Sequence, residues 1–216
     1  MKFKAVLFDL DGTLLDTLDD LADSMNAVLA GSGYPVHEVE AYKYFVGNGL
    51  RNLTERCLPE GHRSVLEIDD YLAQLRKEYG VRWDNKTKPY KGIPELLDTL
   101  AEKDVKMAIL TNKADEFAGR VIKKLLPDWS FEAVVGEKPS LPKKPDPAGA
   151  VRIAGLLGIP CSEFLYLGDT NVDMKTAVSA GMYAVGALWG FRKADELVEG
   201  GARVLIPEPL ALLDLL

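Results

Sequence analysis

Short apolar runs alternate with longer stretches of helical periodicity in the chain after about residue 88. The apolar runs are short enough for strands and lie at residues 105–110, 133–135, 164–167, 183–187 and 203–206. Helical spacing of apolar residues fills the intervals at 93–103, 115–125, 146–157 and 172–180. Residues 4–8 form one more strand-like run near the start of the sequence. Strands that alternate with helices of this length predict an α/β fold with a doubly wound parallel sheet and helices on both faces.

The segment from residue 17 to residue 84 has a different pattern. It contains no strand-like run, and its helical stretches lie at residues 18–30, 38–45, 50–57 and 64–79. Glycine-rich turns at 31–35 and 47–49 separate the first three of these. We therefore expect a catalytic core formed by residues 1–16 and 85–216, and an inserted helical cap formed by residues 17–84. Such a cap would stand above the carboxyl edge of the sheet, where open α/β sheets bind ligands.

Composition and charge narrow the class of protein. The chain has 216 residues, of which 47% are hydrophobic and 27% charged, which is typical of a globular protein large enough to fold without disulfides. Its net charge of −7 argues against nucleic acid and membrane surfaces as partners. The cysteines, Cys57 and Cys161, form no CxxC pair, and no segment resembles a signal peptide or membrane span. We expect a cytoplasmic protein, either a monomer or a homodimer.

Two carboxylates two positions apart follow the first strand, in the sequence Asp9-Leu10-Asp11-Gly12-Thr13. Period-two geometry points both side chains the same way. Close like charges need a cation, and an all-oxygen ligand set suits Mg²⁺. Gly12 lets the backbone turn, and we expect exposed N–H groups there. Taken alone, the same residues could be an acidic turn that ends a strand.

Three further polar segments are expected at the same edge of the sheet. Thr111 and Asn112 follow the strand at 105–110, Lys144 precedes a helix among prolines, and Gly168-Asp169 with Asp173 follows the strand at 164–167. Each has an ordinary explanation by itself: a helix N-cap, a solvated lysine, a polar capping loop. Because carboxyl ends of parallel strands meet at one edge, their coincidence in this order favours a functional site.

Together these segments resemble the four motifs of the haloacid-dehalogenase superfamily. The motifs are Asp9 to Thr13, Thr111, Lys144, and Gly168-Asp169 with Asp173, and the helical block resembles that superfamily's small α-helical cap. Softer patterns at 46–50, 89–93, 111–113 and 188–191 are similar to the phosphoglycolate phosphatase branch. The resemblance implies a Rossmann-like core and a Mg²⁺-dependent phosphomonoesterase that acts on a small phosphorylated metabolite, 2-phosphoglycolate in that branch.

The resemblance also implies roles for individual residues. Asp9 would be the nucleophile that forms an aspartyl-phosphate, and Asp11 the general acid and then the general base. The metal would bind the side chains of Asp9 and Asp169 and the backbone carbonyl of Asp11. Asp173 would lie behind these ligands and orient Lys144 or a metal-bound water.

The phosphoryl oxygens would be held by Thr111 and Lys144, together with N–H groups around Leu10, Asp11 and Asn112. The Gly12 turn belongs to this substrate-binding set. Lys113 could reach the substrate or be a solvated residue at a helix start. A dehalogenase needs no acid for its halide, so Asp11 favours phosphoryl transfer.

In the cap, the Gly49 turn and Arg51 could meet a small anionic group of the substrate. The alternative is that the glycines join two helices and Arg51 faces solvent. Three other functions remain open at this point: a sugar-phosphate mutase, a phosphatase or pyrophosphatase of other specificity, and a non-catalytic sensor of phosphorylated metabolites.

Overall fold

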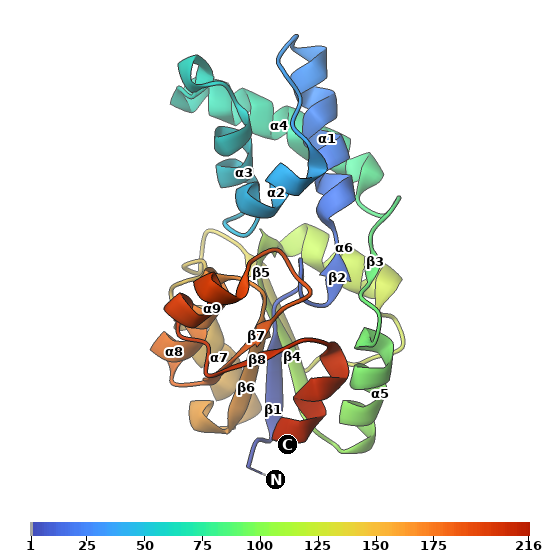
Figure 1. Ribbon diagram of the computed structural model, residues 1–216, viewed down its shortest axis with the longest axis vertical. Coiled ribbons are helices and arrows are strands. Elements are labelled where there is room, and N and C mark those ends of the chain that lie inside the picture. The colour runs from blue at the N-terminus through green and yellow to red at the C-terminus, as the bar shows by residue number, and fades with distance from the viewer. Residues whose placement is uncertain (1) are drawn as a thin grey trace. The chain divides into compact units, whose positions relative to one another are not determined.

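The structure, a computed structural model, describes residues 2–216 and divides the chain into two compact units (Figure 1). The core unit comprises the residues up to Leu15 and Pro89–Leu216, and the helical unit comprises Asp16–Lys88. Within residues 2–216, no helix is both long and apolar enough to cross a membrane.

A six-stranded parallel sheet forms the centre of the core unit, in the order β5-β4-β1-β6-β7-β8 (Figure 1). The strands are β1 (Ala5–Phe8), β4 (Lys106–Ala114), β5 (Ala133–Glu137), β6 (Phe164–Gly168), β7 (Tyr183–Ala187) and β8 (Val204–Ile206). After β1, the chain adds β4 and then β5 on one side of it. It then crosses to the other side of β1, where it adds β6, β7 and β8. The predicted doubly wound sheet is confirmed, and its topological switch point lies at β1.

Helices cover this sheet because its central strands are apolar on both faces. The helices are α5 (Ile93–Glu102), α6 (Asp115–Leu125), α7 (Ala148–Leu157), α8 (Asn171–Ala180) and α9 (Ala194–Gly200). Short 3₁₀ segments lie at Cys161–Glu163 and Pro209–Leu215. Leu7 of β1 shares one apolar cluster with Ile153 of α7 and Met174 of α8. Val6 and Phe8 point the opposite way and are also fully buried, which is why β1 reads as a continuous apolar run.

Strand β4 is longer than its apolar run predicts. It continues past Leu110 to Ala114, so Thr111, Asn112 and Lys113 belong to the strand instead of following it. The pairing of β4 with β5 changes register between Leu110 and Ala114. The polar residues at this end find side-chain partners at the edge of the sheet, so the strand does not need to end where its apolar residues do.

The helical unit has four α-helices close to those expected. They are α1 (Leu18–Gly31), α2 (Val39–Phe45), α3 (Leu50–Cys57) and α4 (Val65–Arg82), with a short 3₁₀ segment at Glu60–His62. Ser64 and Glu67 form a capping box that starts α4. The chain enters and leaves the unit through β2 (Leu15–Asp16) and β3 (Lys88–Pro89), which pair as a two-stranded sheet.

The second boundary between the units lies after Lys88, whereas the sequence pattern places it after residue 84. The reason is the buried carboxylate of Asp20. It accepts hydrogen bonds from the backbone N–H groups of Lys86 and Thr87 and from the Thr87 hydroxyl, at 2.7–3.1 Å. These bonds hold the returning chain to α1 of the helical unit.

Candidate active site

Asp9 lies directly after β1 at the carboxyl edge of the sheet. Its backbone N–H still donates to Leu167 of β6, at 2.9 Å, which fixes the main chain at this point. Its side-chain Oδ1 accepts the Leu10 N–H at 2.7 Å and lies 2.8 Å from Nζ of Lys144. Its Oδ2 accepts no hydrogen bond from residues 2–216. One oxygen of a buried carboxylate is therefore held, and the other remains available to a ligand.

Lys144 is buried among acceptors, and it is not the solvated lysine that its local sequence allows. Its Nζ lies 2.8 Å from Asp9 Oδ1, 2.6 Å from Asp173 Oδ1 and 3.0 Å from the carbonyl of Leu110. The contacts with Asp173 and Leu110 are hydrogen bonds, and the contact with Asp9 is an ion pair. Burial lowers the pKa of Lys144, but the charges of Asp173 and Asp9 outweigh it and hold that pKa well above its usual range.

Asn112 fixes the backbone of Lys144. Its Oδ1 accepts the Lys144 N–H at 2.9 Å, and its Nδ2 donates to the Lys144 carbonyl at 3.0 Å. The Asn112 side chain is thus used within the protein, where it places the lysine, and this leaves the expectation for the Asn112 N–H untouched. The peptide bond between Lys144 and Pro145 is cis.

Asp169 and Asp173 follow β6, and each is fully buried and hydrogen-bonded. Asp169 accepts the Thr13 hydroxyl on Oδ1 at 2.9 Å and the Phe191 N–H on Oδ2 at 2.8 Å. Asp173 forms a capping box with Thr170 at the start of α8, and its Oδ1 faces Lys144. The helix cap and the ion pair fix both oxygens of Asp173.

Asp9, Asp169 and Asp173 form a cluster that fits a metal ion. Each offers one oxygen, and these oxygens lie within 4.8 Å of one another. Burial, with the charge on Asp173 adding to it, raises the pKa of Asp9 well above its usual range and that of Asp169 to about 7. The cluster is therefore short of positive charge, and its oxygen donors suit a hard divalent cation.

Asp11 and Thr111 present groups that the protein leaves open. Asp11 has a side chain 13% exposed, with Oδ1 at 2.8 Å from Nζ of Lys113. Within the described chain, the N–H of Asp11 donates to no acceptor. The Thr111 hydroxyl accepts the Lys113 N–H at 3.1 Å, and its own proton has no acceptor in residues 2–216. Thr111 therefore lies in a strand with a donor to spare and is not a helix N-cap.

Lys113 is neither solvated nor at a helix start. Its side chain is only 4% exposed, it lies in β4, and it forms an ion pair with Asp11. The alternative drawn from the sequence, a solvated lysine, is wrong because the extended strand carries this residue into the edge of the sheet.

Gly12 has a different local role from the expected one. Its N–H donates to the carbonyl of Leu15 at 2.8 Å, so of the N–H groups expected to be exposed in this turn, that of Asp11 is open and that of Gly12 is not. The backbone has φ of 87°, and a Cβ there would lie 2.3 Å from Oδ2 of Asp169 and 2.8 Å from the Phe191 ring. Only glycine lets the turn after β1 pack this closely on Asp169.

The structure also adds residues to which the sequence reasoning gave no role. Thr13 and the Phe191 N–H hold Asp169, and a Cβ on Gly190 would lie 2.2 Å from the Asp169 Cβ. Trp189 donates its indole N–H to the carbonyl of Thr13 at 3.0 Å. The sequence did mark both segments, since Thr13 belongs to the first motif and residues 188–191 to a pattern similar to the phosphoglycolate phosphatase branch. Sequence spacing alone could not pair two segments so far apart along the chain.

The two residues expected to act from the cap lie within the helical unit. Gly49 precedes α3 with φ of 85°. Arg51, on α3, forms an ion pair with Asp69 of α4, and its side chain is 41% exposed. The guanidinium therefore has a partner within its own unit.

Comparison with known proteins agrees with this site. The family model of haloacid dehalogenase-like hydrolases matches residues 6–187. The phosphoglycolate phosphatase of Pseudomonas savastanoi pv. phaseolicola is 32% identical over 209 residues, which cover 95% of this chain and 76% of that protein. The phosphoglycolate phosphatase of Aquifex aeolicus is 31% identical over 195 residues, covering 90% and 89%.

Solved structures show the same fold. A crystal structure from Lactobacillus delbrueckii subsp. bulgaricus has a TM-score of 0.93 and 30% identity, covering 100% of this chain and 98% of that one. A predicted phosphoglycolate phosphatase from Haemophilus somnus has a TM-score of 0.89 and 27% identity, with the same coverage. The chain belongs to the haloacid dehalogenase-like hydrolases and is an enzyme of their phosphoglycolate phosphatase-like branch.

Proposed function

We propose that the protein is a Mg²⁺-dependent phosphomonoesterase that acts on 2-phosphoglycolate through an aspartyl-phosphate on Asp9. The observation that carries this proposal is the state of Asp9: Oδ1 is held by Leu10 and Lys144, while Oδ2 accepts no hydrogen bond within residues 2–216. A carboxylate held in this way is a preoriented nucleophile. The names of the two curated relatives support the substrate.

In the first half of the reaction, one carboxylate oxygen of Asp9 forms a bond to phosphorus while the bond between phosphorus and the ester oxygen breaks. The leaving oxygen takes a proton from the carboxyl group of Asp11, which starts the reaction protonated. An alkoxide is a poor leaving group, so this proton transfer matters most for alkyl phosphates. The products of this half are the alcohol and phosphorylated Asp9.

In the second half, the ionised carboxylate of Asp11 takes a proton from a water molecule. The water oxygen bonds to phosphorus, the bond between phosphorus and Asp9 breaks, and inorganic phosphate leaves. Asp11 ends the cycle protonated and Asp9 ends it as a carboxylate. The same residue thus serves as the acid in one half and as the base in the other.

The transferring phosphoryl group needs donors for its oxygens in both halves. Lys144 supplies a fixed ammonium beside Asp9, and the Thr111 hydroxyl has a proton to donate. The open N–H of Asp11 is a third donor on the same edge. These groups would let an acidic protein hold a dianion.

The residues that would hold Mg²⁺ are Asp9 and Asp169 through their side chains and Asp11 through its carbonyl, with Asp173 behind them orienting Lys144. When bound, the ion supplies positive charge that keeps the carboxylates ionised and offsets charge on the phosphoryl oxygens. Thr13 and Phe191 fix both oxygens of Asp169 for this role.

We propose that the helical unit is the cap that selects the substrate, with Gly49 and Arg51 as candidates to meet the carboxylate of 2-phosphoglycolate. Release of Arg51 from Asp69 would be required for a contact through the guanidinium. The protein would be a cytoplasmic monomer or homodimer.

The test is phosphate release with Mg²⁺ from a panel of small phosphate esters and pyrophosphate, compared by kcat/KM. We expect 2-phosphoglycolate to lead the panel and the Asp9→Asn variant to release no phosphate. A flat profile would reject 2-phosphoglycolate as the specific substrate while keeping the chemistry. Movement of phosphate within a sugar phosphate would indicate a mutase, and binding without turnover would indicate a sensor.

A further inference from the structure

Lys113 is a buried cation at the site whose role the mechanism above does not use. It lies two residues after Thr111 in β4, in the stretch where the pairing of β4 with β5 changes register. Its Nζ lies 2.8 Å from Oδ1 of Asp11, and its side chain is 4% exposed. Burial of an ammonium group is costly unless the group is paired, so this contact is a fixed feature of the edge.

The backbone that carries Lys113 is held on two sides. Its N–H donates to the Thr111 hydroxyl at 3.1 Å. Its carbonyl lies so close to Gly136 of β5 that a Cβ there would come within 2.8 Å of it. The N–H of Gly136 in turn donates to Asp115 Oδ1 at 2.9 Å, just after the end of β4. Lys113 therefore reaches Asp11 from a rigid strand end.

We propose that Lys113 is a positioning residue for Asp11, which rests on the proposed function of Asp11 as general acid and base. Lys113 occupies Oδ1, and this oxygen can accept the ammonium N–H whether Asp11 is neutral or ionised. The exchangeable proton of Asp11 is then confined to Oδ2, which accepts no hydrogen bond from residues 2–216. A carboxyl group that presents one oxygen in one orientation transfers its proton without first reorganising.

The kinetic consequence depends on the leaving group. The ratio kcat/KM reports the steps up to departure of the alcohol, and an alkoxide needs the proton of Asp11 whereas p-nitrophenolate does not. Removing the ammonium with Lys113→Met should lower kcat/KM for an alkyl phosphate about 10- to 100-fold, a part of what general acid catalysis contributes. The loss for p-nitrophenyl phosphate should be less than about 3-fold, because its leaving group gains little from an acid.

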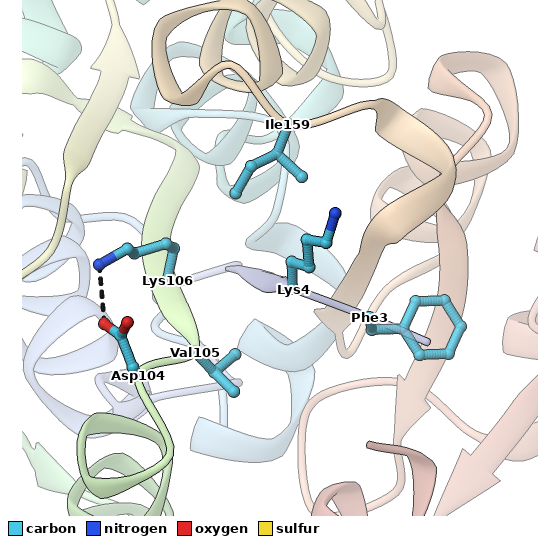
Figure 2. A pocket seen from close by; sticks show the side chains of 6 residues that line it. All are labelled: Phe3, Lys4, Asp104, Val105, Lys106 and Ile159. Atoms are coloured by element: carbon cyan, nitrogen blue, oxygen red, sulfur yellow. Dashed lines mark hydrogen bonds and ion pairs between the residues drawn. The ribbon is translucent and has the colours of Figure 1, made fainter. Parts of the chain in front are cut away.

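A matched control lies on the same strand. Lys106, the first residue of β4, pairs with Asp104 at 2.9 Å and lines a pocket of about 240 Å³ with Phe3, Lys4, Asp104, Val105 and Ile159 (Figure 2). It stands at the amino end of the strand, away from the site. Lys106→Met removes the same charge from the same strand, although from an exposed ion pair, and we expect it to change neither rate.

The experiment compares wild type, Lys113→Met, Lys113→Arg, Lys106→Met and the pair Asp11→Asn and Asp11→Asn/Lys113→Met on both esters. Thermal unfolding of each variant checks that it is folded. We expect Lys113→Met to lose more kcat/KM on the alkyl ester than on the aryl ester, and Lys113→Arg to recover part of that loss. Once Asp11 is replaced by Asn, adding Lys113→Met should lower kcat/KM no further. For 2-phosphoglycolate and ethyl phosphate, which differ in the carboxylate, the losses should be equal.

Three outcomes would overturn the inference. Equal losses on alkyl and aryl esters would make Lys113 merely structural, and an additive effect in the Asp11→Asn background would separate the two residues. A loss confined to 2-phosphoglycolate would assign Lys113 to substrate binding. Failure of the proposed function looks different: the wild type would then hydrolyse neither ester, or Asp11→Asn would match the wild type on the alkyl ester.

Discussion

Nζ of Lys144 lies 2.6 Å from Oδ1 of Asp173, and both side chains are excluded from solvent. The same ammonium contacts Asp9 at 2.8 Å, so one cation serves two buried carboxylates. Because Asp173 also caps α8 through Thr170, the lysine links the helix start to the proposed nucleophile. The positions of the Asp9 and Asp173 side chains in the site therefore both depend on Lys144.

Replacement of Lys144 should damage both folding and activity. Lys144→Met leaves two buried carboxylates without their cation, which should cost about 3–5 kcal/mol of unfolding free energy in metal-free protein. Denaturant unfolding with EDTA measures this change. The control is Lys138→Met, whose partner Asp115 is 3.9 Å away and half exposed, with an expected change within about 1 kcal/mol. Equal stability of the two variants would contradict the account.

The close contact at Gly12 gives a second prediction. Gly12→Ala forces a Cβ to within 2.3 Å of Asp169 Oδ2 at a φ of 87°, so Asp169 must move. We expect the variant to lose Mg²⁺ affinity, measured by calorimetry, as well as stability. Gly181→Ala is the matched control, because Gly181 has φ of 73° in the same unit but nothing within 4 Å of its would-be Cβ. It should cost about 1 kcal/mol from backbone strain alone and leave metal binding intact.

The carboxylate cluster predicts that stabilisation by Mg²⁺ increases with pH. Burial raises the pKa of Asp169 to about 7 in the folded protein, against about 4 for an unfolded aspartate. Metal-free folded protein therefore holds a proton that the unfolded chain releases, and this contribution to stability is complete below pH about 4 and lost as the pH rises through about 7. A bound cation competes with that proton.

Thermal unfolding from pH 5 to pH 8, with Mg²⁺ or with EDTA, measures this linkage. We expect the difference in Tm between the two conditions to widen as the pH rises. In Asp169→Asn the difference should be small at every pH. If the difference in Tm between Mg²⁺ and EDTA were the same at every pH in the wild type, the assignment of Asp169 as a metal ligand would be contradicted.

In the helical unit, the hydrogen bonds that Asp20 accepts from Lys86 and Thr87 give a further prediction. Asp20→Ala removes the acceptor for the N–H groups of Lys86 and Thr87, which should cost about 2–3 kcal/mol if those groups stay buried. Hydrogen exchange at these two amides should accelerate. Asp19→Ala, an exposed neighbour on the same helix, should leave their exchange unchanged. Unaltered protection in Asp20→Ala would show that other contacts hold this segment.

The sequence was sufficient to predict features that depend on local periodicity. The strand at β1 and the helices α3 and α6 follow directly from apolar spacing, and the edge shared by Asp9, Lys144 and Asp169 follows from parallel topology. Helix α9 went unpredicted because it is short and much of its sequence is acidic or exposed. Its one fully buried large side chain, Leu197, gives no periodic signal.

Features that depend on partners far along the chain were beyond sequence reasoning. The extension of β4 to Ala114 depends on pairing with Glu137, and the burial of Lys113 depends on Asp11. In each case a polar residue lies where its own sequence neighbourhood predicts exposure, and a tertiary partner makes its burial possible.

The central claim is a covalent phosphoryl group on Asp9, and rapid acid quench with phosphate-labelled 2-phosphoglycolate tests it most directly. The account predicts a transient label on the wild-type protein that hydroxylamine removes and that maps to the peptide containing Asp9. Asp9→Asn should carry no label and release no phosphate. A label on another residue, or turnover by Asp9→Asn at the wild-type rate, would contradict the account.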